Sequence, residues 1–406
     1  MSFDAIKCPF LHILFFIKQW YNISQATKKS NPQLENIMLE ITNFRDGQIL
    51  NSHHGTEFAD SLEIRIEGIA PPQENVTVNG VPAIRHDRNF HATVLLKNKI
   101  NRIVVVSDGY FGEKTLAITL VWDKKSYKRY CFFVDDCCFF LRKLTLDRPK
   151  SLFDEMFLAG LKKAHDKYGT KFLLNLFYHD DHHDFSICDV PEDYKAEFQA
   201  NKDWLRLSFH ARSEFPDRPY QHADAEKLAA DFDEVYNEVC RFAGKECFMA
   251  PVVIHWGMTN PENFSVLKER GVRSLAGCFL GGIARIGEKH SIQVTDIGYH
   301  YEKDMACGAC DKHIFYDRFH DLYLFDNTAC CNHDDISTLQ KKIESIAPEQ
   351  HVITIMTHEQ YTYADYFNYI PDHLDRIEEA CRLATEYGFK PAWFSKGLLG
   401  NEIWDN

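Results

Sequence analysis

The sequence predicts a mixed α/β fold in which a small all-β sandwich precedes a larger parallel (β/α) barrel. Its 406 residues exceed what one hydrophobic core usually fills, so two domains are expected. Residues 38–122 alternate apolar and polar side chains in short runs, which is typical of strands with one buried face. From Tyr130 onward, apolar strands alternate with amphipathic helices, and this order indicates a parallel sheet.

Residues 1–37 form an N-terminal extension to which the sequence assigns no role. Its apolar stretch FLHILFFI holds only eight residues, lacks a basic leader and precedes no small-residue cleavage site. We therefore expect a short extra helix there, with a remnant of a targeting segment as the alternative.

Residues 38–123 are predicted to form an immunoglobulin-like β-sandwich. Runs such as SLEIRIEG and NRIVVVSDG are separated by glycine, proline, asparagine and aspartate, and Asn79-Gly80 is a typical hairpin turn. Nothing in this region suggests chemistry. We expect it to shape substrate access or to mediate homo-oligomerisation.

Residues 124–406 carry the repeated strand and helix units. The strands are expected at YCFFVDD, KFLLNLFY, WLRLSFH, CFMAPVVI and HVITIMTH. One helical face is indicated by apolar residues that recur every three or four positions, namely Leu228, Phe232, Val235, Val239 and Phe242. Asn260 before Pro261 predicts a helix start, and a further helix is expected from Pro371 to Tyr387. This number of units favours a barrel.

The charge and cysteine content argue against several classes of protein. A net charge of −13 disfavours a nucleic-acid partner and an anionic membrane surface, and a neutral or cationic substrate fits better. The 13 cysteines are odd in number and scattered or adjacent, unlike a secreted disulfide framework. We therefore expect reduced thiols and a cytoplasmic protein.

Polar residues stand at the ends of the predicted strands. Asp135 and Asp136 end the first strand, and His210, His255 and His358 lie at the ends of later ones. The active site of a parallel barrel lies at these ends, so the side chains are expected to converge. Aspartate and histidine are typical ligands of zinc, and two adjacent carboxylates repel unless a cation neutralises one. The sequence predicts one divalent metal ion, zinc first, with cobalt, nickel or manganese as alternatives.

With these residues the chain resembles the polysaccharide deacetylase superfamily, also called carbohydrate esterase family 4 or NodB-like domains, over residues 130–394. The paired aspartates match the first motif of the family. The resemblance implies that Asp135 is the catalytic base and that Asp136 binds metal. His358, in IMTHEQY, matches the histidine that acts as general acid in the family.

The chain departs from this family in two motifs. His210 matches the first histidine of the metal-binding pair, but Glu214 stands four residues later where the family has a second histidine. That spacing places both on one helical face, and a carboxylate can also bind zinc, so Glu214 is predicted as a ligand. The Arg-Pro-Pro-Tyr-like motif is replaced by MAPVVIHWG, in which we expect His255 and Trp256 to contact substrate. Packing of His255 beside Trp256 is the alternative.

The resemblance implies a seven-stranded (β/α) barrel that hydrolyses a C–N amide bond. Its expected substrate is an N-acetylated sugar or oligosaccharide, and neither nucleic acid nor membrane is an expected partner. One alternative is an amidohydrolase that acts on a small cyclic amide or ureide. The other is a degenerate barrel that binds carbohydrate without catalysis.

Two further strings have a metal-like composition. YHDDHHDF (178–185) lacks fixed ligand spacing and is predicted to be a solvated loop of the active site, with a second metal as the alternative. Cys307 and Cys310, with Cys330, Cys331 and His333, are predicted to be buried or loop thiols rather than a zinc ribbon.

Overall fold

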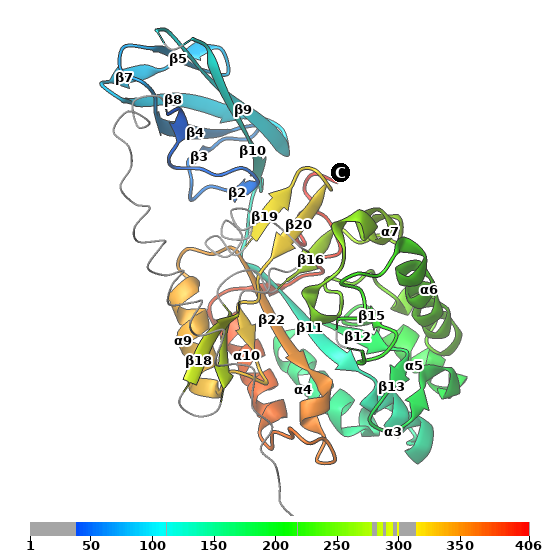
Figure 1. Cartoon of the computed structure of the whole chain (residues 1–406). Helices are drawn as coiled ribbons and strands as arrows, with labels where there is room; N and C mark the ends of the chain where they lie inside the picture. The colour runs from blue at the N-terminus through cyan, green and yellow to red at the C-terminus, as the bar shows by residue number, and fades with distance from the viewer. Residues whose placement is uncertain are drawn as a thin grey trace, which may run out of the picture. The chain divides into compact units, whose positions relative to one another are not determined.

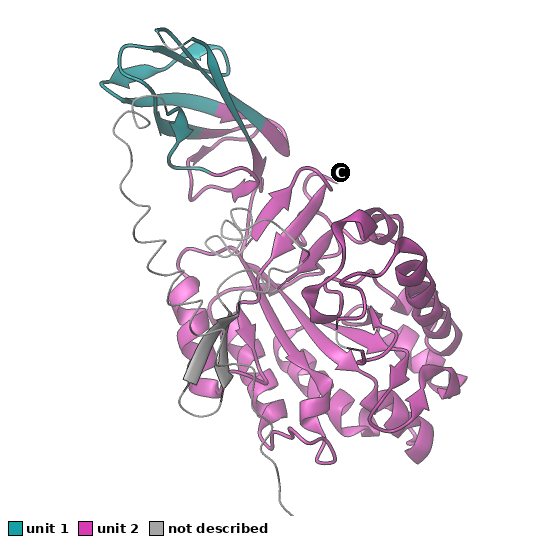
Figure 2. Cartoon of the chain, in the orientation of Figure 1, with its two compact units in different colours: residues 1–44, 64–94, 102–118 teal, residues 45–63, 95–101, 119–406 magenta. Residues whose placement is uncertain are grey.

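The computed structural model describes residues 38–110, 112–216, 218–277, 282–286, 290–294, 299 and 314–405, with backbone only for 282–286 and 290–294 (Figure 1). The extension 1–37, Cys307 and Cys310 lie outside the described residues, so the expectations for them stay predictions. The chain divides into two compact units, one of residues 1–44, 64–94 and 102–118 and one of residues 45–63, 95–101 and 119–406 (Figure 2). The domain boundary expected after residue 123 stays a prediction.

The first part of the chain forms two largely antiparallel sheets, as the alternating pattern predicts. One has the order β1 (Glu40–Ile41), β4 (Leu62–Ile69), β8 (Asn89–Leu96), β7 (Ile84–His86), with β3 (Thr56–Glu57) beside β4. The other has the order β2 (Gln48–Leu50), β10 (Lys114–Trp122), β9 (Ile100–Asp108), β5 (Asn75–Val78), β6 (Val81–Pro82). Along β4, Leu62, Ile64 and Ile66 are buried at every second position, so one face lies in the core.

The hairpin predicted at Asn79-Gly80 is confirmed. These two residues join β5 to β6, and their φ angles are 50° and 79°. A type I′ turn requires positive φ at both positions, which asparagine and glycine tolerate best.

A parallel sheet holds the second part of the chain together. Its order is β21 (Ala329–Cys330), β22 (Val352–His358), β11 (Arg129–Cys137), β12 (Phe172–Phe177), β15 (Leu205–Ala211), and β23 (Lys390–Pro391) also pairs with β11. Every residue of β11 is buried, as expected for a central parallel strand covered on both faces. The register sets Asp135 opposite His358, so two of the polar strand ends are neighbours.

Helices connect these strands (Figure 1). They are α3 (Phe139–Asp147), α4 (Met156–Tyr168), α5 (Lys195–Ala200), α6 (Ala225–Phe242), α7 (Phe264–Glu269), α9 (Ile336–Ile346) and α10 (His373–Glu386). The apolar face predicted for α6 is confirmed, because its five periodic residues are all buried. Asn260 accepts a hydrogen bond from Glu262 N and starts a short 3-10 turn before α7, as predicted. No helix in the described residues is long and apolar enough to cross a membrane.

The segments that follow β15 along the chain also lie side by side. Phe248 forms a parallel bridge with Leu207 of β15, and Ala276 N donates to Val252 O at 2.5 Å. A three-stranded sheet contains β16 (Ser274–Ala276), parallel to β20 (Leu322–Phe325), which in turn pairs antiparallel with β19 (Ile314–Asp317). Two antiparallel pairs complete the described strands: β13 (His179–Asp180) with β14 (Phe185–Ser186), and β17 (Gly282–Ile286) with β18 (His290–Val294). The regular strand expected at CFMAPVVI is wrong, since this segment forms only one isolated bridge, at Phe248. Closure into a barrel stays a prediction.

Arg129 is a fully buried cation at the start of β11. Its guanidinium donates to the carbonyl oxygens of Leu398 (3.0 Å) and Leu399 (2.6 Å), and to Asp123 Oδ2 (3.0 Å). A buried charge is tolerated only when it is paired and hydrogen-bonded, and these acceptors meet that condition. Arg129 thereby ties β11 to the C-terminal residues of the chain.

Replacing Arg129 by methionine is expected to lower the free energy of unfolding by about 3–5 kcal/mol, because Asp123 then stays buried without its cation. Urea denaturation followed by tryptophan fluorescence measures this change. The matched control is Arg382→Met, whose ion pairs with Glu379 and Glu386 lie at the surface and are in part solvent-exposed, with an expected loss of about 1 kcal/mol or less. Equal losses in the two variants would contradict the assigned role of Arg129.

Candidate metal centre

Asp135 and Asp136 occupy neighbouring positions at the end of β11. In a regular strand, their side chains would point to opposite faces. Here the register against β12 shifts between Val134 and Cys137, and Asp136 adopts a left-handed backbone with φ of 56°. Both carboxylates consequently approach one imidazole: Asp135 Oδ1 lies 3.9 Å from His210 Nδ1, and Asp136 Oδ1 lies 3.1 Å from His210 Nε2.

Asp136, His210 and His255 present three ligand atoms in a compact triangle. Its edges are 3.1 Å from Asp136 Oδ1 to His210 Nε2, 3.0 Å from His210 Nε2 to His255 Nδ1, and 3.5 Å from His255 Nδ1 to Asp136 Oδ1. Ligands of a tetrahedral zinc ion, at about 2.0–2.1 Å from the metal, are about 3.3 Å apart. The triangle therefore has the size of one face of such a tetrahedron. It is the one group of this kind among the described residues.

The chemistry of these side chains fits a cation. All three residues are buried, and among the described residues Asp136 Oδ1 faces only imidazole nitrogens, of His210 at 3.1 Å and of His255 at 3.5 Å. Burial alone would raise the pKa of Asp136, but the neighbouring His358 and His210 outweigh it and lower that pKa. Burial and His210 lower the pKa of His255 to about 3. An ionised carboxylate and a neutral imidazole are the forms that bind a divalent metal.

His358 ends β22 beside this triangle. Its Nε2 lies 3.8 Å from Asp136 Oδ2, and its Nδ1 lies 3.0 Å from Asn332 Oδ1. Because an amide oxygen only accepts, Nδ1 carries the hydrogen of that bond. The same oxygen also accepts from the backbone N–H of His358 at 3.2 Å. Asn332 thus fixes the orientation and tautomer of His358, and a lone asparagine gave no signal in the sequence.

Asp135 differs electrostatically from its neighbour. Burial raises its pKa, although His210, His358 and a hydrogen bond from Asn175 act in the opposite direction. Asn175 Nδ2 donates to Asp135 Oδ1 at 2.7 Å and holds the carboxylate in place. The two adjacent aspartates therefore have pKa values shifted apart, which is the usual sign of separate chemical roles.

Glu359 connects the two strand ends that carry these groups. Its carboxylate, fully buried, accepts from the backbone N–H groups of Cys138 (2.7 Å), Phe139 (3.0 Å) and Phe140 (2.5 Å) at the start of α3. A carboxylate is favoured at a helix N-terminus, where backbone N–H groups lack partners. Because Glu359 directly follows His358, it fastens the end of β22 to the turn after Asp136.

Glu214 lies outside the ligand triangle. The helical spacing expected from His210 to Glu214 is wrong, because His210 is in β15 and the strand is followed by a bend rather than a helix. The Glu214 carboxylate accepts from His182 Nε2 at 2.6 Å and from Gln360 Nε2 at 2.9 Å. His182 belongs to the predicted loop YHDDHHDF, so that loop lies next to this end of the sheet.

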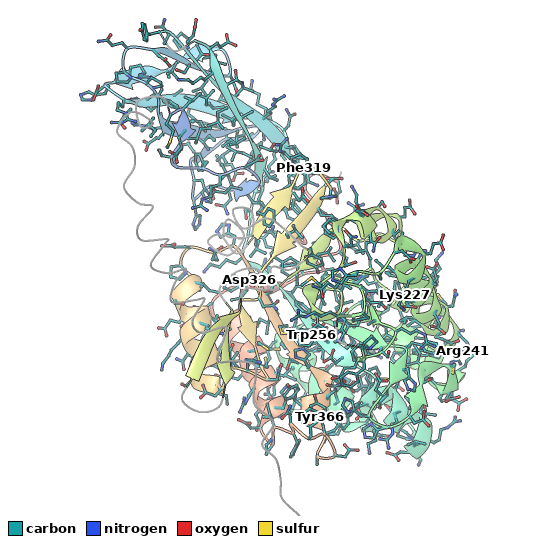
Figure 3. All side chains as sticks on the ribbon, in the orientation of Figure 1. Lys227, Arg241, Trp256, Phe319, Asp326 and Tyr366 are labelled. Atoms are coloured by element: carbon teal, nitrogen blue, oxygen red, sulfur yellow. The ribbon has the colours of Figure 1, made fainter. Side chains whose placement is uncertain are left out.

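His255 and Trp256 occupy a short 3-10 turn (η5, His255–Gly257). The structure places the His255 imidazole in the ligand triangle, whereas the residue Trp256 is 48% exposed (labelled in Figure 3). Trp256 has a φ of 66°, an unfavourable angle for a bulky residue, and the guanidinium of Arg218 lies 5.4 Å from its ring. The turn therefore buries one side chain in the ligand triangle and exposes the next.

The cysteines that the structure describes are free thiols. Cys330 is partly buried and Cys331 fully buried, as expected for buried or loop thiols. Burial raises the pKa of Cys137 and Cys138, directly behind the aspartates. These thiols are therefore protonated at neutral pH.

No protein family and no curated protein matches this chain. Among solved structures, a polysaccharide deacetylase from Bacillus cereus is similar at 9% identity and a TM-score of 0.25, covering 67% of this chain and 98% of that one. A family 123 glycoside hydrolase from Clostridium perfringens, described in connection with glycolipid glycan hydrolysis, is similar at 11% identity and a TM-score of 0.24, covering 87% of this chain and 75% of that one. Both likenesses are distant, so the function is argued from the site.

The protein is expected to bind about one zinc ion per chain through Asp136, His210 and His255. Elemental analysis after dialysis against a weak chelator measures the stoichiometry. Asp136→Asn and His255→Gln should lose the ion, whereas Glu214→Gln, the matched acidic control, should keep it. Loss in Glu214→Gln with retention in His255→Gln would instead make Glu214 the third ligand.

Zinc affinity is expected to rise with pH, by about tenfold per pH unit below the pKa of His210. Burial alone would lower that pKa, but the charges of Asp135 and Asp136 raise it above its ordinary value, so a proton must leave His210 before zinc binds. His255, with its pKa near 3, contributes no further proton. Titration calorimetry from pH 5.5 to 8, in a His358→Gln background, measures this slope. An affinity independent of pH would be inconsistent with ligation by His210.

Proposed function

We propose that this protein is a metal-dependent hydrolase of a C–N amide bond, built on a (β/α) barrel. The observation that carries the proposal is the ligand triangle of Asp136, His210 and His255, with Asp135 and His358 beside it. Three protein ligands leave a position open for water, which is the arrangement of a catalytic zinc site. We assign the third ligand to His255 in place of Glu214.

When bound, a divalent ion supplies a Lewis acid that polarises the amide carbonyl and lowers the pKa of a water molecule. Asp136, His210 and His255 would hold it. The buried Asp136 Oδ1, which faces two imidazole nitrogens, and the neutral His255 support this assignment independently of any resemblance.

Asp135 is the proposed general base. It takes a proton from water as the water oxygen bonds to the carbonyl carbon. Because burial raises its pKa, the carboxylate is a stronger base than an exposed aspartate would be. The hydrogen bond from Asn175 keeps it oriented during the transfer.

His358 is the proposed general acid. With Nδ1–H donated to Asn332, the other nitrogen, Nε2, carries the exchangeable proton and lies on the side of Asp136. It protonates the amide nitrogen as the C–N bond breaks. Water thus adds its hydroxyl to the acyl carbon and a hydrogen to the nitrogen, and the products are a carboxylic acid and an amine.

We further propose that the substrate is an N-acetylated amino sugar or oligosaccharide. The half-exposed ring of Trp256 directly follows the ligand His255, so an aromatic face is available beside the reacting groups. Flat aromatic rings stack on the apolar faces of sugar rings and combine large contact area with little loss of entropy. Acetate would be the leaving acid and the deacetylated sugar the product.

The zinc-loaded protein is expected to release acetate and free amine in equal amounts from a pentamer of N-acetylglucosamine. Asp135→Asn and His358→Gln should each lower kcat by about 10²–10⁴-fold while keeping the metal, because each removes one proton-transfer group. Acetate release and zinc content are measured on the same samples.

The matched controls are Asp233→Asn, which removes a surface partner of Arg270, and His320→Gln, which removes a partner of Asp317. Both should retain wild-type activity. Full activity in Asp135→Asn, or acetate release unaffected by removing the metal, would refute the proposed mechanism.

A further inference from the structure

We infer that the phenol of Tyr361 donates a hydrogen bond to the substrate carbonyl oxygen as this oxygen becomes negatively charged. The inference rests on the proposed amide hydrolysis and adds to it a catalytic residue that neither the sequence analysis nor the resemblance singles out. It concerns the step in which the planar amide becomes tetrahedral, when charge develops on oxygen.

Tyr361 is placed next to the reacting groups by the chain itself. It lies in a 3-10 turn (η8, Glu359–Thr362) that starts directly after His358. Its ring centroid is 6.0 Å from the imidazole of His358 and 5.3 Å from the ring of Tyr366, which Figure 3 labels. Its backbone oxygen accepts a hydrogen bond from Ile370 N at 2.9 Å, so the turn is fixed on both sides.

The phenol is in the form that can donate. Burial first, and the charge of Asp136 second, raise the pKa of Tyr361, which keeps its proton at neutral pH. The contact between its ring and the imidazole of His358, at 6.0 Å between centroids, is the geometry that places the phenol beside the reacting groups. The residue is only partly buried, so a substrate can reach it.

Two other side-chain donors at this end of the sheet are already engaged. The amide of Asn175 donates to Asp135 at 2.7 Å, and the amide of Gln360 donates to Glu214 at 2.9 Å. Each is held by a carboxylate of the protein. A hydrogen bond in which the amide of Asn332 acts as donor to the Tyr361 oxygen lowers the pKa of the phenol against the effect of burial, so the O–H of Tyr361 can still turn toward a substrate oxygen.

Donors of this kind have measurable effects on rate. Loss of one oxyanion donor lowers kcat by about 10²–10³-fold where donors act alone. With a metal ion sharing the charge, we expect a smaller loss, about 10–100-fold. Because the hydrogen bond strengthens only as the charge develops, KM should change little.

The test compares the zinc-loaded wild type with Tyr361→Phe and with Tyr369→Phe, a matched control whose ring is 41% exposed. Phenylalanine keeps the ring, so packing against His358 and Tyr366 persists. Three quantities are measured: kcat and KM on the N-acetylglucosamine pentamer, zinc content, and the calorimetric affinity for a methylphosphonamidate of glucosamine, which imitates the charged tetrahedral species. In Tyr361→Phe, kcat and phosphonamidate affinity should each fall about tenfold or more, with KM and zinc content unchanged.

Each other outcome overturns the inference. Unchanged kcat and phosphonamidate affinity in Tyr361→Phe would remove Tyr361 from the reaction and leave the proposed hydrolase intact. Loss of zinc, or a rise in KM alone, would make its role structural or limited to substrate binding. Equal losses in Tyr369→Phe would show that the effect is not specific. A wild type that binds no zinc or releases no acetate would overturn the proposed function itself, and this inference with it.

Discussion

The buried carboxylate of Glu359 is the constraint on which the geometry of the site depends. Three backbone N–H groups at the start of α3 donate hydrogen bonds to it. The hydroxyl of Tyr363 is hydrogen-bonded both to Glu359 and to Glu155 at the start of α4. Burial and the nearby Glu155 raise the pKa of Glu359 to about 8, while the N–H groups favour its charge. One side chain thereby aligns two helix starts with the ends of β11 and β22, and so sets where Asp136 and His358 meet.

The irregular end of β11 is the second constraint. A regular strand would send Asp135 and Asp136 to opposite faces of the sheet, where they could not share a site. The left-handed turn at Asp136 and the register shift bring both to one side. Once there, they are distinguished by their contacts: imidazoles lower the pKa of Asp136, and burial raises that of Asp135. Identical residues thus acquire different chemistry from a small change in backbone path.

The sequence predicts much of this arrangement, for identifiable physical reasons. Strand ends of a parallel sheet meet at one edge, so apolar runs that end in Asp135, Asp136, His210 and His358 locate four groups that the structure brings together. The assignment of a helical face to Glu214 has no equivalent in the structure, since β15 is followed by a bend. His255 is also expected at this edge, but as a substrate contact, and it enters the triangle through a short turn rather than a regular strand end. Amides such as Asn332 and Asn175 are positioned only by tertiary contacts.

The wide separation of the ligands along the chain has a consequence for how the centre is acquired. Asp136, His210 and His255 come from three distant segments and meet only when β11, β12 and β15 have paired. Contacts between such distant residues form late and slowly, because long loops must close first. An ion therefore cannot nucleate the fold as it does in a zinc finger. An ion bound by these residues would enter a nearly finished scaffold and would then stabilise the native state by mass action, to an extent that grows with the logarithm of the free metal concentration.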